Sequence, residues 1–123
     1  MTSRAAILSA DESAEYFTEE QCHILELSNS EADEDASVAR ARVEPGVTTR
    51  KHRVAGTTER YVIQSGSGRV MVDGLPDTDV QPGDVVVIPP GAVQSVRNTG
   101  ADDLVFLCIC TPRFKWENYE SLE

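Results

Sequence analysis

The sequence has no apolar run approaching the roughly 20 residues that a helix needs to cross a bilayer. Its apolar segments are short and interrupted by charged or turn-forming residues. The first 13 residues contain one Arg and a short, weakly apolar patch, which differs from the charged and apolar regions of a secretory signal. We therefore expect a cytoplasmic protein with no membrane partner.

Basic residues are scarce: 11 Lys and Arg stand against 21 Asp and Glu, for a net charge of −10. Binding to phosphate backbones needs clustered basic side chains, so nucleic acid is not an expected partner. Residues 5–39 hold ten acidic residues and no Lys or Arg, as a solvated surface would. Residues 40–60 hold six of the eleven basic residues and only two acidic ones, Glu44 and Glu59.

Cysteine and histidine are also few, with three Cys and two His. An odd cysteine count in a protein expected to be cytoplasmic argues against a disulfide framework. Cys108 and Cys110 share one face of an apolar strand and are expected to be small buried side chains. His23 lies outside the patterns described below and is expected to be a surface or packing residue.

Short alternating segments separated by Gly and Pro run through most of the chain, which predicts an all-β sandwich or barrel. We expect one domain, with an N-terminal arm carrying an edge strand over 1–36, a barrel core over 37–111 and a tail over 112–123. A turn of helix is allowed near the C-terminus. The expected strands are 22–27, 37–43, 50–54, 59–64, 69–74, two short strands within 79–93, 94–98 and 104–110.

Two spaced patterns lie within this core. The first places a histidine and a glutamate between two glycines, and the second places an amide side chain after a Pro-Gly turn. Their members are Gly46, His52, Val54, Glu59 and Gly66 in the first, and Gly83, Pro89, Gly91, Gln94 and Asn98 in the second.

These patterns resemble the two motifs of the cupin superfamily, in particular its small single-domain members. The resemblance implies a cupin jelly-roll barrel (double-stranded β-helix), commonly a homodimer, with an interior metal held by three His and one Glu. His52 and Glu59 occupy two of those positions. Val54 and Gln94 stand where the other two histidines are expected.

The resemblance implies a candidate metal site of His52, Glu59 and Gln94, for Mn, Fe, Ni or Zn. One imidazole and two oxygen donors suit these ions less well than three imidazoles and a carboxylate. The alternative is a metal-free polar cavity, in which Glu59 accepts a hydrogen bond from His52 and Gln94 binds a ligand or water. Both alternatives stay open at this stage.

Strand alternation indicates how these side chains meet. The strands on either side of the turn 55–58 are expected to pair antiparallel, so that His52 and Glu59 converge from neighbouring strands. Arg50 shares a face with His52, and Tyr61 shares one with Glu59, which makes both candidate ligand-binding residues. Arg40 and Arg42 share a face that we expect to point outward.

Three functions follow. The first is an enzyme acting on a small polar, anionic molecule, with His52 and Glu59 catalytic and chemistry of the isomerase, lyase or hydrolase type. The second is a non-catalytic binding or sensing module with a metal-free barrel, and the third is a structural domain with a filled interior. All three are expected to dimerise, with strand 22–27 available to a partner's sheet because free sheet edges pair readily.

Overall fold

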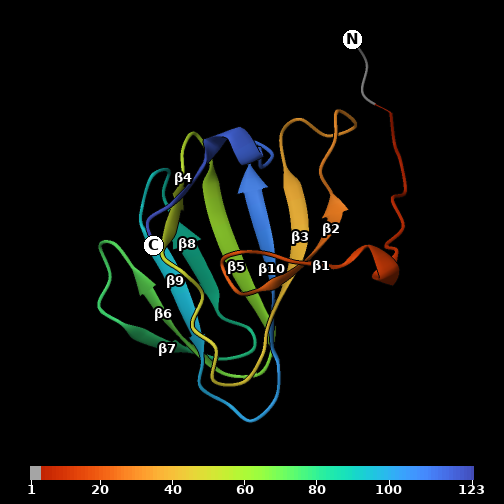
Figure 1. The fold of residues 1–123 in the computed structure, drawn as a ribbon. Coiled ribbons are helices and arrows are strands. Elements are labelled where there is room, and N and C mark those ends of the chain that lie inside the picture. The colour runs from red at the N-terminus through yellow and green to blue at the C-terminus, as the bar shows by residue number, and fades with distance from the viewer. Residues whose placement is uncertain (1–3) are drawn as a thin grey trace.

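The computed structural model describes residues 4–123 as two antiparallel sheets that face each other (Figure 1). The six-stranded sheet has the order β1 (Tyr16–Phe17), β2 (His23–Ser28), β3 (Ser37–Val43), β10 (Leu104–Thr111), β5 (Thr58–Ser65) and β8 (Val85–Ile88). The five-stranded sheet has the order β11 (Tyr119–Ser121), β4 (His52–Val54), β9 (Gln94–Asn98), β6 (Gly68–Val72) and β7 (Thr78–Val80). The all-β barrel prediction is confirmed.

Alternation along the strands separates the barrel interior from the outer surface. In β5, Glu59, Tyr61 and Ile63 are buried, while the residues between them are partly exposed. In β8, Val86 and Ile88 are buried, while their neighbours face solvent. These two strands therefore contribute every second side chain to the interior, as a pleated sheet with one covered face requires.

Apolar side chains fill one end of the barrel. Val43, Ile63, Val70, Val96 and Leu104 are each at most 1% exposed and belong to one hydrophobic cluster. At about 25 cal/mol for each Å² of apolar surface removed from water, this cluster is the main stabilising element of the fold.

The hairpin between β5 and β6 presses against the start of β10, and this contact requires glycine. A Cβ on Gly66 would lie 2.6 Å from the carbonyl oxygen of Asp103, and its φ of +85° is also unfavourable for other residues. A Cβ on Gly68 would lie 2.8 Å from a methyl carbon of Leu104. The two glycines therefore allow the β5–β6 hairpin to pack against β10 at the apolar end of the barrel, which we call the packed end.

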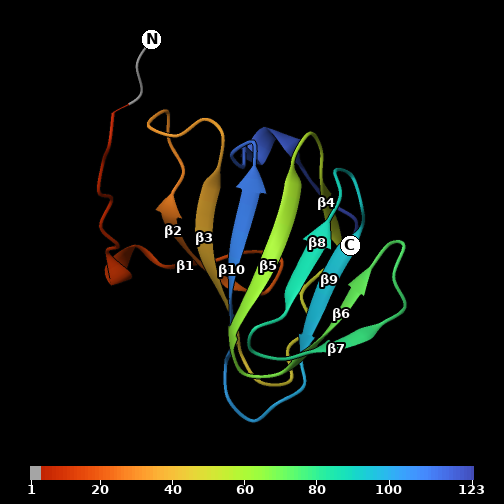
Figure 2. The ribbon, with the colours of Figure 1, turned by 180° about the vertical axis from the view of Figure 1, so that it is seen from behind.

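The predicted pairing of the strands around residues 55–58 is wrong. β4 pairs with β9 and β11, whereas β5 pairs with β10 and β8 in the opposite sheet. The connection crosses from one sheet to the other at the top of the barrel, with Gly56 at φ +73° (Figure 1 and Figure 2). The turn residues fit a hairpin and a barrel corner equally well, so local sequence did not distinguish them. His52 and Glu59 consequently face each other from opposing sheets.

The N-terminal segment forms a hairpin of β1 and β2 that crosses in front of β5 and β10 (Figure 1). β2 was expected at the sheet edge, but it lies between β1 and β3, so β1 is the outermost strand. Before the hairpin, the 3₁₀ turn η1 (Glu12–Ala14) lies against the outer face of β3. There Arg40 and Arg42 point outward, as expected, and bind the carboxylates of Glu12 and Glu15.

The C-terminal segment contains the expected helical turn, the 3₁₀ turn η2 (Trp116–Asn118). It continues into β11, which pairs with β4 and had not been predicted. In residues 4–123, no helix is long and apolar enough to span a membrane.

Candidate functional site

A cavity of about 70 Å³ lies between the sheets next to the apolar cluster, with which it shares Ala41, Val96 and Phe106. Its inner part is lined by His52, Glu59, Tyr61, Cys108 and Cys110. Its outer part is lined by the β1–β2 hairpin and by aromatic residues of the C-terminal segment. The space is large enough for several water molecules or for part of a small ligand.

His52 is buried, and its ring has a defined orientation. Its Nδ1 lies 3.0 Å from the carbonyl oxygen of Arg50 and 3.1 Å from Oε2 of Glu20. Both neighbours are acceptors, so Nδ1 carries the hydrogen and donates it. The neutral ring therefore has its lone pair on Nε2. Tyr119 stacks on the same ring, with 5.2 Å between centroids.

Glu20 is the partner of His52 and was not among the residues predicted from the sequence. The hairpin turn places it inward, with Thr18 and Cys22 buried on the same side. The Cys22 thiol donates to Oε1 at 3.1 Å, and the Tyr119 hydroxyl donates to Oε2 at 3.4 Å. The alternating positions of Thr18, Glu20 and Cys22 could have indicated that these side chains share one buried face. The neighbouring acidic residues instead suggested a solvated surface.

Glu59 projects into the cavity from β5, and it is only 9% exposed. Its Oε1 atom is buried and has no hydrogen-bond partner. Burial raises the pKa of this carboxyl group, while a hydrogen bond from Gln94 and the charge of His52 act in the opposite direction. Glu59 therefore holds its proton to a higher pH than an ordinary glutamate.

Gln94 lies behind Glu59, and Tyr61, which lines the cavity, binds Gln94. Gln94 is 1% exposed, pairs with His52 across β4 and β9, and does not line the cavity. The Tyr61 hydroxyl donates to Oε1 of Gln94, which leaves the amide hydrogens of Gln94 for Glu59. Burial raises the pKa of Tyr61, so its hydroxyl remains a donor.

Three free cysteines, Cys22, Cys108 and Cys110, also line the cavity. Burial raises the pKa of each thiol, in the case of Cys110 to about 12. They are therefore protonated, weakly polar side chains and not activated nucleophiles.

The structure brings His52, Glu59 and Tyr61 to one cavity, with Gln94 immediately behind it. The hydrogen bond expected from His52 to Glu59 in a metal-free cavity is replaced by the bond from His52 to Glu20. The Arg50 side chain is exposed and lies outside the cavity lining, and only its backbone meets this region. Strand β4 begins at residue 52, so the alternation that linked the Arg50 and His52 side chains does not apply.

The Cupin_2 family model, a cupin domain, matches residues 39–110. The chain belongs to the cupin family. An oxalate-binding protein of Thermotoga maritima is 37% identical over 71 residues, which cover 58% of this chain and 58% of that protein. The match thus spans less than two thirds of the relative's length.

Solved structures show the same fold. A predicted oxalate decarboxylase from Thermotoga maritima has a TM-score of 0.71 at 25% identity, covering 91% of this chain and 99% of the other. Streptomyces PAC13 with uridine has a TM-score of 0.80 at 16% identity, covering 98% of this chain and 92% of the other. Pac13 is described as a nucleoside dehydratase. At 16% identity, this likeness concerns the fold alone.

Cupins often bind a metal ion, but the side chains of this cavity do not fit one. Val54 contributes an apolar wall, and Oε1 of Gln94 already accepts from Tyr61. Nδ1 of His52 donates to Arg50 and Glu20, so Nε2 of His52 and the Glu59 carboxyl are the two donors that remain at the motif positions. Over residues 4–123, no group of three or more His, Cys, Asp or Glu residues is arranged to hold an ion.

Proposed function

We propose that this cupin binds a small polar molecule in the barrel and transfers protons on it, with His52 as the base and Glu59 as the acid. One observation carries the proposal: Nδ1 of His52 is fixed between two acceptors, while Glu59 holds a partnerless buried oxygen in the same cavity. Two titratable groups whose environments favour opposite roles are typical of an acid–base site.

The environment of His52 favours a base. The fixed Nδ1–H leaves the Nε2 lone pair as the atom that can accept a proton. The carboxylate of Glu20 would stabilise the imidazolium that results, in the way a buried acid supports a catalytic histidine. Stacking on Tyr119 restricts rotation of the ring.

The environment of Glu59 favours an acid. Its raised pKa keeps the carboxyl protonated over a wider pH range. Ionisation during reaction would be supported by the Gln94 amide and by the newly charged His52. In this role Glu59 carries the proton that it gives to the substrate, and the Gln94 amide and the His52 charge stabilise the anion that remains.

These roles fit an elimination or an isomerisation. Nε2 of His52 would take a proton from a carbon next to a carbonyl group, and the C–H electron pair would form a double bond. In an elimination, the departing hydroxyl takes the Glu59 proton and leaves as water. In an isomerisation, that proton is delivered to the substrate instead. Transfer of the proton from His52 back to Glu59 restores the starting state.

Turnover can be tested in deuterated water. Small hydroxyketones, sugars and nucleosides would be incubated with the protein, and deuterium incorporation or loss of water would be followed by NMR. We expect activity that Glu59→Gln and His52→Asn each reduce by at least about 100-fold. Arg69→Gln, an exposed position outside the cavity lining, is the control. Activity that survives both site variants would overturn the proposal.

A non-catalytic binding or sensing module is the second candidate. The observation that favours it is the replacement of two family histidines by Val54 and Gln94. It predicts ligands that raise the melting temperature and are returned chemically unchanged, with no deuterium incorporated.

A homodimer also stays a prediction. On the outer face of the six-stranded sheet, Val85 and Val87 are 55% and 56% exposed, and a second copy would cover them. Light scattering measures this directly, and Val85→Lys should shift a dimer toward monomers.

A further inference from the structure

The outer part of the cavity is surrounded by aromatic rings. Tyr16 comes from β1, while Phe114, Trp116 and Tyr119 come from the C-terminal segment. The ring centroid of Trp116 lies 4.9 Å from that of Phe114 and 5.1 Å from that of Tyr119. Tyr16 is 38% exposed and Trp116 is 48% exposed, so these two rings border the opening.

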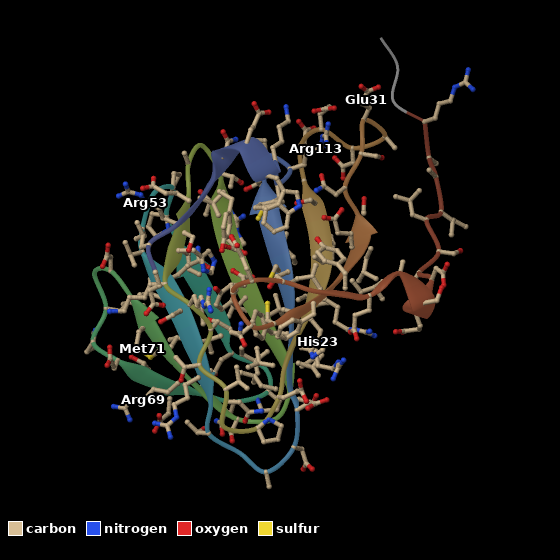
Figure 3. The ribbon with its side chains drawn as sticks, in the orientation of Figure 1. His23, Glu31, Arg53, Arg69, Met71 and Arg113 are labelled. Carbon is tan, nitrogen blue, oxygen red and sulfur yellow. The ribbon has the colours of Figure 1, made fainter. Side chains whose placement is uncertain are left out.

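The cavity contains three acidic side chains, of which Glu59 is the one proposed to carry its proton. Glu20, Glu26 and Glu59 line it, and Tyr16 donates its hydroxyl hydrogen to Glu26 at 3.3 Å. Among residues 4–123, no Lys or Arg belongs to the lining. Figure 3 shows Arg53 and Arg69 at the outside of the barrel, where they pair with acidic residues.

We propose that the cavity takes a small organic cation, whose ammonium group lies among Tyr16, Trp116 and Tyr119 with Glu20 and Glu26 nearby. The aromatic rings supply negative faces, and cages of such rings are a recurrent solution for quaternary ammonium groups. The partnerless Oε1 of Glu59 provides an acceptor for a polar group deeper in the cavity.

A dicarboxylate such as oxalate fits this cavity poorly. It would lie beside Glu20 and Glu26 and meet no guanidinium or ammonium group, so its desolvation would not be compensated. The anionic ligand expected from sequence rested on the basic residues of 40–60. Those side chains form ion pairs or lie outside the lining.

This inference rests on the proposed site and is tested separately from its chemistry. Trp116 is the single tryptophan, so its fluorescence reports binding at the opening. The probes are choline and its uncharged counterpart of the same shape, 3,3-dimethylbutan-1-ol, together with oxalate. We expect saturable quenching by choline, with affinity roughly tenfold higher than for the alcohol. Equal affinity for the two, preference for oxalate, or no response to choline would each overturn the inference.

Matched variants locate the cation, with calorimetry replacing fluorescence where Trp116 is changed. Trp116→Phe keeps a ring and should retain most of the choline affinity, whereas Trp116→Ala should lose roughly tenfold. Glu26→Gln should weaken the binding of choline and leave the affinity for the uncharged alcohol unchanged. If choline binds as expected but no proton transfer is found on any substrate, the acid–base function fails and the cation site stands. If proton transfer is found but choline does not bind as expected, the cation site is wrong and the acid–base function stands.

Discussion

The two ends of the barrel are built from the same strands but contain different side chains. Along its inner face, β5 runs from Glu59 at the cavity end to Ile63 at the packed end, and β3 runs from Ser37 to Val43. The backbone pairing continues through both halves. Along these two strands, the inner-face side chains at the cavity end are small or polar, as Ser37 and Glu59 show, and those at the packed end are apolar. Substitutions at either end should therefore have different and predictable effects.

The largest effect is expected at the packed end. Leu104 is fully buried, and Leu104→Ala should lower the free energy of unfolding by about 2–5 kcal/mol because it leaves a cavity. Leu107→Ala, on the outer face of the same strand, should cost much less. Urea unfolding measures both, and similar costs would show that the two faces of β10 are not distinct.

At the cavity end, Glu59→Gln should make the protein more stable near neutral pH, by roughly 1–2 kcal/mol, because it removes a buried acid that has no cationic partner. The folded-state pKa lies above the ordinary value of 4.5, so the stability that the acid form contributes is lost as pH rises from there through the folded-state pKa. The advantage of the variant should grow over that window and be constant below it. A stability difference that does not vary with pH would contradict the raised pKa.

Glu15, on the outer face, should behave in the opposite way. Hydrogen bonds from Arg42 and Arg40 lower its pKa from 4.5 to about 2. Its contribution is present above pH 4.5 and is lost as pH falls toward 2. Glu15→Gln should cost on the order of 1 kcal/mol at pH 7, since the pairs lie near solvent. Unfolding curves at pH 7 and pH 2 check this, and an equal cost at both would argue against the ion pairs.

The smallest change in stability is expected from Ala39→Val. This residue lines the cavity on the inner face of β3, and the added methyl groups have space there. Stability should change by less than about 1 kcal/mol, while choline binding should fall strongly. Unchanged binding would place the ligand away from this wall.

Regular alternation made most of the barrel predictable. Strands 37–43 and 94–98 have the bounds that their sequence pattern indicated. In the second strand, Ser95 is buried although it lies on the face opposite Gln94 and Val96. The sheet membership of β4 was not predictable in the same way. It depends on pairing with β9 and β11, far along the chain, which no local pattern at residues 55–58 encodes.

The cavity lining was predictable where a family motif marked it and less so elsewhere. His52 and Glu59 stand at motif positions, and both line the cavity. Glu20 comes from a hairpin outside the motifs, and its burial depends on a backbone contact between its carbonyl and the amide of Arg50. The exposure of Arg50 likewise follows from where β4 begins. The alternating pattern predicted a strand from residue 50, but β4 begins at His52.

The central claim, a base and an acid set by opposite environments in one cavity, is tested most directly by NMR of the intact protein. Nitrogen shifts of His52 and the side-chain carboxyl shift of Glu59 would be followed from acid to neutral pH. We predict that the neutral His52 ring carries its hydrogen on Nδ1 and that Glu59 titrates above the ordinary glutamate range. A hydrogen on Nε2, or a Glu59 that titrates at or below that range, would contradict it.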